Sequence, residues 1–237
     1  MTSDRLAQTV RQQLGLGRLV PLGNPRDGAW ITERAAEAVL QRAAEGVRGV
    51  RLGAVRIALT DPDDAQEPAV PPPPSALLPG PLRLTADFAA TASAPLPTTA
   101  ARLRSTLATA AIQQLGLTVT DVDLRVTALL DEDTAPTAVR PPEPRAASEA
   151  REGDEARVAE AALGVPGVTG LTGALGRAVH IEERQTDDTV LPHRHVRVEL
   201  ATAADHRALD VAREVRAAVS KALRNAPTVA VLVTAVT

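Results

Sequence analysis

The sequence contains no cysteine and no tyrosine, and it has only one tryptophan, one phenylalanine and one methionine. Without cysteine the chain cannot form a disulfide, a thiol nucleophile, an iron–sulfur cluster or a cysteine zinc site. The scarcity of aromatic rings removes the stacking platforms with which proteins hold single-stranded nucleic acid. Any core must therefore be built from aliphatic side chains, which make up most of the 44% of hydrophobic residues.

The chain also lacks an excess of one charge and any long apolar run. Its net charge is −3 over 237 residues, which disfavours the strongly basic face of a nucleic-acid-binding protein. No run approaches the roughly 20 apolar residues that cross a bilayer, and the first ten residues lack the apolar segment of a signal peptide. We expect a cytoplasmic protein with no direct membrane span. Its arginine-, alanine- and proline-rich composition suggests an actinobacterial, GC-rich genome.

Two proline-rich stretches divide the chain. Residues 61–81 contain four consecutive prolines, which lack backbone N–H donors, so the sequence predicts an extended or disordered loop. Residues 131–153 are acidic and carry several further prolines, which predicts a disordered linker. We therefore expect a first domain at 23–130 and a second at 154–237. Residues 1–22 form an N-terminal arm with a short helix, because Leu6, Val10 and Leu14 recur every four residues.

Both domains show the same predicted order of elements. In the first, apolar spacing predicts a helix at 33–45, strands at 55–59 and 82–88, a helix at 100–111 and a strand at 122–126. In the second, it predicts a helix at 154–163, strands at 179–184 and 196–202, a helix at 209–223 and a strand at 229–236. An internal duplication explains the shared order. The predicted fold class is α+β: two tandem α-β-β-α-β domains, each a three-stranded sheet with two helices on one face.

Three segments carry a family resemblance. Ile31 and Thr32 precede the first predicted helix, which closes on Val-Arg-Gly-Val at 47–50. The second domain has Val-Pro-Gly-Val at 165–168 and Val-Ala-Arg-Glu-Val at 211–215. These motifs resemble those of the alkaline shock protein, or envelope stress response, family of Gram-positive bacteria. In that family the first helix follows an Ile-Ser pair and ends at Val-Pro-Gly-Val. The chain departs from this pattern by its proline-rich insertion and by the missing Ile-Ser pair in the second domain.

The resemblance implies a non-enzymatic scaffold linked to cell-envelope stress. Members of the family are abundant cytoplasmic proteins that self-associate, and some are held at the membrane by an integral membrane partner. By this resemblance we expect self-association or binding of a protein partner, an integral membrane protein among the candidates, with a cytoplasmic location that is peripheral to the membrane through that partner.

The last strand of the second domain offers a candidate interaction surface. Its two faces are both apolar, whereas the first domain has Asp123, Arg125 and Thr127 at the corresponding outward positions. We expect an outer face that requires cover, either by the other copy or by an associating protein. Its predicted residues are Ala230, Leu232, Thr234, His195 and Arg197. On the second alternative, Leu232→Asp would disrupt assembly without unfolding the first copy.

A glycine-rich turn at 167–176 supports an alternative function. Gly167, Gly170 and Gly173 have the spacing of the backbone clamp in K-homology (KH) RNA-binding domains, and Arg177 follows them. Turn chemistry explains the glycines equally well, and Arg177 is the only nearby cation. A KH-like RNA-binding module is therefore the rival interpretation, and nucleic acid is not the expected partner.

No sequence pattern indicates a metal site or a catalytic site. His193 and His195 lie two apart on a predicted strand, but the arginines on the same face would repel a cation. Asp121 and Asp123 alternate on an outer face and lack the enclosure that paired catalytic carboxylates need. We predict no catalytic residue, no metal site and no cofactor, and hence no enzyme.

Overall fold

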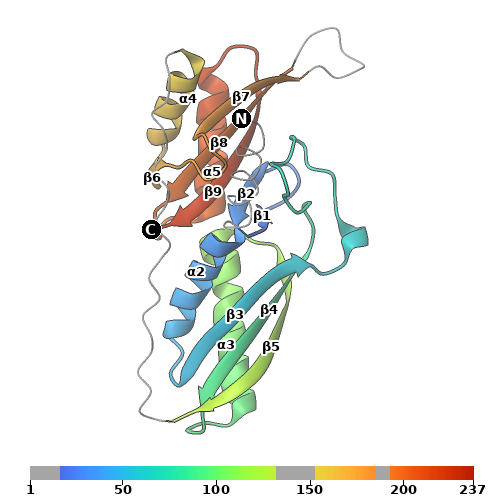
Figure 1. Ribbon diagram of the computed structural model, residues 1–237, viewed down its shortest axis with the longest axis vertical. Coiled ribbons are helices and arrows are strands. Elements are labelled where there is room, and N and C mark those ends of the chain that lie inside the picture. Colours follow the sequence, from blue (N-terminus) through green and yellow to red (C-terminus); the bar gives the residue numbers. More distant parts are fainter. Residues whose placement is uncertain (1–16, 132–152, 185–192) are drawn as a thin grey trace, which may run out of the picture.

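The computed structural model describes residues 17–131, 153–184 and 193–237, which fold into an α+β arrangement with two sheets (Figure 1). The elements are β1 (Leu19–Leu22), β2 (Ala29–Thr32), α2 (Glu33–Glu45), β3 (Val50–Leu59), the 3-10 helix η1 (Pro62–Asp64), β4 (Leu82–Thr91), α3 (Leu96–Thr109), the π-helix η2 (Ala110–Leu115), β5 (Val119–Leu130), α4 (Asp154–Leu163), β6 (Val168–Leu171), β7 (Val179–Arg184), β8 (His193–Thr202), α5 (Ala208–Ala222) and β9 (Thr228–Val236). Within these ranges no helix has the length and apolar character needed to cross a membrane. The predicted short helix around Leu6, Val10 and Leu14 and most of the predicted linker lie outside the described residues.

The first sheet has the order β3-β4-β5. Strands β3 and β4 form an antiparallel pair across the long proline-rich loop, while β4 and β5 are parallel and are connected by α3. Helices α2 and α3 cover one face of this sheet (Figure 1). Helix α2 begins where the sequence predicts, because the Thr32 hydroxyl accepts a hydrogen bond from the Ala35 N–H at 3.2 Å and caps the first turn.

The second sheet has the order β1-β2-β9-β8, with β6 and β7 both paired to β8. Strands β8 and β9 are parallel and are connected by α5, whereas β7 runs antiparallel to β8. Helices α4 and α5 cover one face (Figure 1). The order of helices and strands at 154–237 follows the prediction, with β6 as an additional short strand, but the sheet has six strands and not the predicted three.

The N-terminal strands correct the predicted domain boundaries. Strand β2 pairs in parallel with β9, so residues 19–32 complete the second sheet and belong neither to an arm nor to the first sheet. The turn between β1 and β2 is fixed by Asp27, which accepts hydrogen bonds from Arg213 at 2.8 and 3.1 Å and from the Asn24 N–H at 2.7 Å. Burial alone raises the pKa of Asp27, but these bonds and the neighbouring guanidinium groups outweigh burial and lower it.

The proline-rich loop is also corrected, because it packs against the second sheet instead of being disordered. Its Leu77 N–H donates to the Leu19 carbonyl at 2.8 Å, and the Trp30 indole Nε1–H donates to the Leu77 carbonyl at 3.2 Å. Val70 is buried with Leu19 and Trp30 in a small apolar cluster. The prolines set an extended path that lays the loop over the strands.

One continuous cluster of buried apolar side chains runs through both halves of the described chain. The halves meet where η2 approaches the start of α5: Arg207 Nε donates to the Ile112 carbonyl at 3.2 Å, and a side chain on Gly116 would collide with Leu209. Gly116 has a left-handed backbone, with φ of 88°, and ends the helical segment. The two halves thus share one core.

Candidate interaction surface

The predicted apolar face of β9 is covered by the chain itself. Ala230 and Leu232 are fully buried in the small cluster with Leu19, Trp30 and Val70. The prediction placed them correctly on one face of the strand and expected that face to need cover. Of its two alternatives, cover by an associating protein is wrong, because segments of the same chain close the face. The cover comes from β1, β2 and the proline-rich loop.

The other predicted members of this surface form internal polar contacts. The Thr234 hydroxyl lies 2.7 Å from the Thr172 hydroxyl and donates to the Leu200 carbonyl at 3.3 Å. His195 is buried, with Nδ1 at 2.8 Å from the Thr228 hydroxyl. These contacts stabilise the pairing of β8 and β9, and they leave no exposed apolar patch at the predicted site.

A buried carboxyl group, that of Glu199, lies beside these residues, and the sequence pattern did not single it out. Its Oε2 accepts a hydrogen bond from the Leu175 N–H at 2.9 Å, and its Oε1 lies 3.5 Å from Arg197 Nε without hydrogen-bond geometry. Burial raises the pKa of Glu199 to about 7, although the Leu175 N–H and Arg197 act in the opposite direction. The alternation of side chains along β8 places Glu199 on the outer face with Arg197. Its burial follows from the loop between β6 and β7, which contains Leu175 and covers this face.

The glycine-rich turn does not form an RNA clamp of the K-homology type. Gly170 lies within strand β6 and pairs with Ala201, so these glycines do not connect two helices as that clamp requires. Gly167 has φ of 85° and sits so close to the His206 ring that a side chain would collide with it. Arg177 is paired with Glu155 at 3.5 Å. The glycines therefore serve the turn and the close packing around it.

The candidates for metal binding and catalysis are not assembled into a site either. Asp121 and Asp123 are ion-paired with Arg83, at 3.8 and 3.5 Å respectively. Among residues 17–131, 153–184 and 193–237, no three histidine or acidic side chains are grouped as a metal would require. The side chain of His193 lies outside the described part of the structure.

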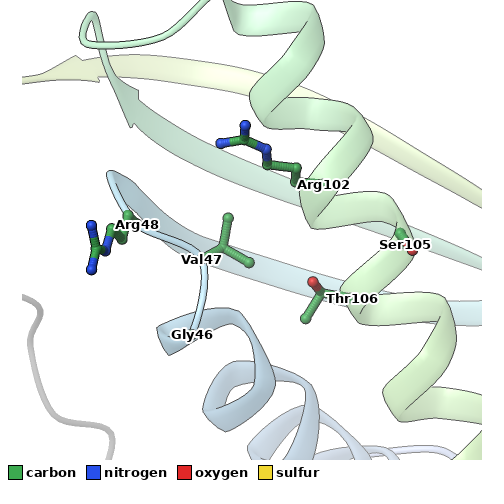
Figure 2. Close-up of a pocket in the computed structure, with 6 residues that line it drawn as sticks. All are labelled: Gly46, Val47, Arg48, Arg102, Ser105 and Thr106. Atoms are coloured by element: carbon green, nitrogen blue, oxygen red, sulfur yellow. The ribbon is translucent and has the colours of Figure 1, made fainter.

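A shallow pocket of about 480 Å³ lies between the end of α2 and the side of α3 (Figure 2). It is lined by Gly46, Val47, Arg48, Arg102, Ser105 and Thr106. Figure 2 shows that the Arg48 side chain extends away from α3, whereas Arg102 and Thr106 project from that helix. A specific small-molecule site needs polar groups that converge on one point. These polar groups do not converge, so the pocket is a weak candidate.

The strongest candidate surface is instead strand β5, at the margin of the first sheet (Figure 1). Val126 and Leu129 are 40% and 66% exposed, although they lie opposite the buried Phe88 and Ala90 of β4. Cross-strand neighbours share a face of the sheet, so both side chains point toward the helix-covered side. Both side chains therefore lie at the border of the core, where it is not fully covered. We use the name β5 edge for the side of β5 that faces away from β4, together with Val126 and Leu129.

The equivalent strand of the second sheet shows how such an edge is completed. The β4–β5 and β8–β9 pairs share a bulge at a threonine: Thr127 donates to the Phe88 carbonyl at 3.3 Å, and Thr234 to the Leu200 carbonyl at 3.3 Å. The β4–β5 pair has a second register shift at Thr120. Val233 and Val236 occupy the positions of Val126 and Leu129 around the Thr234 bulge, yet they are 0% and 7% exposed. Strand β2 pairs with the outer edge of β9 as far as Val233. Beyond it, Thr32 donates to the Thr234 carbonyl, and Arg42 of helix α2 donates to the Val236 carbonyl. Within the described chain, no strand occupies the outer edge of β5.

The β5 edge carries ordered charges on its outer face. Arg125 makes two hydrogen bonds to Asp87, at 2.8 and 2.9 Å, and these bonds lower the pKa of the Asp87 carboxyl. Asp123 is paired with Arg83, as described above. At the edge itself, Arg104 Nε donates to the Val122 carbonyl at 3.0 Å. The edge therefore combines apolar side chains on one face with alternating charges on the other.

Comparison with known proteins adds no assignment to this geometry. No model of a known protein family matches the chain, and no curated protein matches its sequence.

Proposed function

We propose that this protein is a non-enzymatic scaffold that binds other protein chains at the β5 edge. The observation that carries the proposal is the difference between equivalent strands: Val126 and Leu129 are exposed, whereas Val233 is buried beside the added strand β2 and Val236 is buried where helix α2 follows that strand. Addition of a strand to an open sheet edge is a common mode of protein recognition, since backbone hydrogen bonds and alternate side chains both contribute.

We further propose that the two halves are tandem copies of one α-β-β-α-β unit. The shared order of elements and the threonine bulge at the same place in β5 and β9 support this duplication. The motifs that resemble the alkaline shock family fit the same view: a scaffold of the envelope stress response type, located in the cytoplasm and held at the membrane through a partner. The first copy, not the second, then supplies the association surface.

Sedimentation of the purified protein, together with a pull-down from its own cell extract, tests the scaffold. Val126→Lys places a charge on the β5 edge and is expected to remove association and captured partners. The control is Leu163→Lys, because Leu163 is also exposed but lies on α4, away from β5. Equal effects of the two variants would overturn the assignment of the edge. If the purified protein binds RNA, and this binding weakens steeply as the salt concentration rises, a nucleic-acid function is favoured instead.

A further inference from the structure

We infer that the occupant of the β5 edge is the β5 edge of a second copy of this chain, paired antiparallel about a two-fold axis at Leu124. This inference rests on the proposed function and names its partner. Pairing two identical edges joins two three-stranded sheets into one continuous sheet, and a two-fold axis closes the assembly, so neither copy retains an open β5.

The inner-face residues of β5 define this register. Val119, Val122, Leu124, Val126 and Leu129 lie opposite residues of β4 that belong to the main core. With the axis at Leu124, Leu124 faces its own copy, Val122 faces the partner's Val126, and Val119 faces the partner's Leu129. Every inner-face pair is then apolar, and the two most exposed side chains each gain an apolar neighbour.

The outer face supports the same register through charge. With the axis at Leu124, Asp123 lies opposite the partner's Arg125 on both sides of the axis. Asp123 is already 3.5 Å from Arg83, and Arg125 is already 2.8 Å from Asp87. The paired sheets would carry a row in which basic and acidic side chains alternate across four strands. A register shifted by two residues places Asp123 opposite the partner's Asp123 or Arg125 opposite the partner's Arg125, where like charges repel.

The segment of the chain that directly precedes α4, which corresponds to the one that fills the edge of β9, is a poorer occupant. The segment that fills the edge of β9 is Ala29–Thr32, which contains tryptophan, isoleucine and threonine. The residues before α4, at 146–152, have the sequence Ala-Ala-Ser-Glu-Ala-Arg-Glu. They include no β-branched or aromatic residue, and such a sequence disfavours a strand. Strand β5 itself is rich in valine, threonine and leucine, so a second β5 satisfies the edge better.

One contact must be released on pairing. The Arg104 side chain donates to the Val122 carbonyl, and this carbonyl lies within the stretch that the partner strand would cover. Arg104 is otherwise solvent-exposed, so its release exposes no buried charge.

Charge reversal tests the register with the intact protein. Asp123→Arg alone places arginines opposite each other, and Arg125→Asp alone places acids opposite each other. Each variant is expected to bind its own copy roughly tenfold more weakly or worse, because a dimer contains two such pairs. An equimolar mixture restores opposite charges at both pairs, so sedimentation velocity is expected to show a dimer of twice the 24.7 kDa chain mass only in the mixture and in the unchanged protein. Recovery in the mixture also shows that both variants are folded.

Cross-linking provides an independent measurement. Because the chain has no cysteine, Leu124→Cys introduces a single thiol, and mild oxidation is expected to give a covalent dimer; the control, Leu163→Cys, is not. If the protein dimerises but neither the mixture nor Leu124→Cys behaves as stated, the register is overturned and the scaffold proposal survives. If it stays monomeric at its highest soluble concentration, the self-pairing is overturned. In that case, if Val126→Lys loses a protein that the unchanged protein captures, the proposal that the β5 edge binds another protein chain is still supported.

Discussion

Replacing Glu199 with glutamine is expected to remove a pH dependence from the stability of the fold. Burial raises the pKa of this carboxyl from 4.5 to about 7 in the folded protein. Between these values the folded state keeps a proton that the unfolded chain releases, so the free energy of unfolding falls as pH rises through this window and is level above it. The difference in pKa corresponds to roughly 3 kcal/mol.

The side chain of glutamine has nearly the same shape and can still accept the hydrogen bond from the Leu175 N–H. Glu199→Gln is therefore expected to be as stable as the unchanged protein near pH 4.5 and more stable above pH 7, by up to roughly 3 kcal/mol. Urea unfolding followed by circular dichroism from about pH 5 to about pH 8 measures the difference. The matched control is Glu183→Gln, because Glu183 is exposed on β7. If Glu199→Gln is less stable than the unchanged protein at pH 8, the carboxylate is ionised in the fold, Arg197 stabilises it, and our reasoning from burial is wrong.

Three further substitutions test the packing described above. Leu232→Ala is expected to lower the free energy of unfolding by about 2–5 kcal/mol, because the side chain is fully buried; a normal thermal transition with altered assembly would instead restore it as a surface residue. Asp27→Asn is expected to cost about 1–3 kcal/mol, because it weakens the acceptor of the Arg213 bonds. Since the pKa of Asp27 is lowered by folding, its contribution is present near neutral pH and is lost as pH falls below its ordinary value of 3.8; stability curves that stay parallel in acid would contradict this. Thr234→Val is expected to destabilise more than Thr127→Val in urea unfolding, since Thr234 also contacts the Thr172 hydroxyl; equal losses would argue against that contact.

Much of the secondary structure follows from local sequence alone. The helices at 33–45 and 154–163 and the strand at 179–184 have the predicted bounds. Each combines a clear apolar period with a defined end, such as the Thr32 cap or the glycine that follows the helix. Most other elements extend beyond the prediction at one or both ends, because pairing with a neighbour holds residues whose own pattern is weak. Strand β5, for example, continues on both sides of its predicted core, from 122–126 to Val119–Leu130.

Short strands and loops could not be predicted in the same way. Strands β1 and β2 have four residues each and all of them are buried, so no alternation distinguishes them from a loop. The proline-rich loop has no periodicity, yet its position is fixed by contacts with β1 and Trp30, which lie 40 or more residues earlier in the sequence. In both cases the information lies in the partner segment and not in the segment itself.

The two errors about the interaction surface have one physical cause. Leu232 is apolar on an outward face and was proposed as part of a surface for an associating protein, with cover by the other copy as the alternative, while Val126 was placed with the inward residues of its strand. The structure reverses both, because a segment about 200 residues earlier covers Leu232 and no described strand covers the edge beside Val126. The pattern within a strand determines which face a side chain occupies, but the neighbour across the edge determines whether that face is closed. Equivalent strands with the same bulge and the same apolar positions thus differ in exposure only through their neighbours. A second chain that paired with the β5 edge would bury the apolar side chains that the neighbours of β9 already bury in the other half.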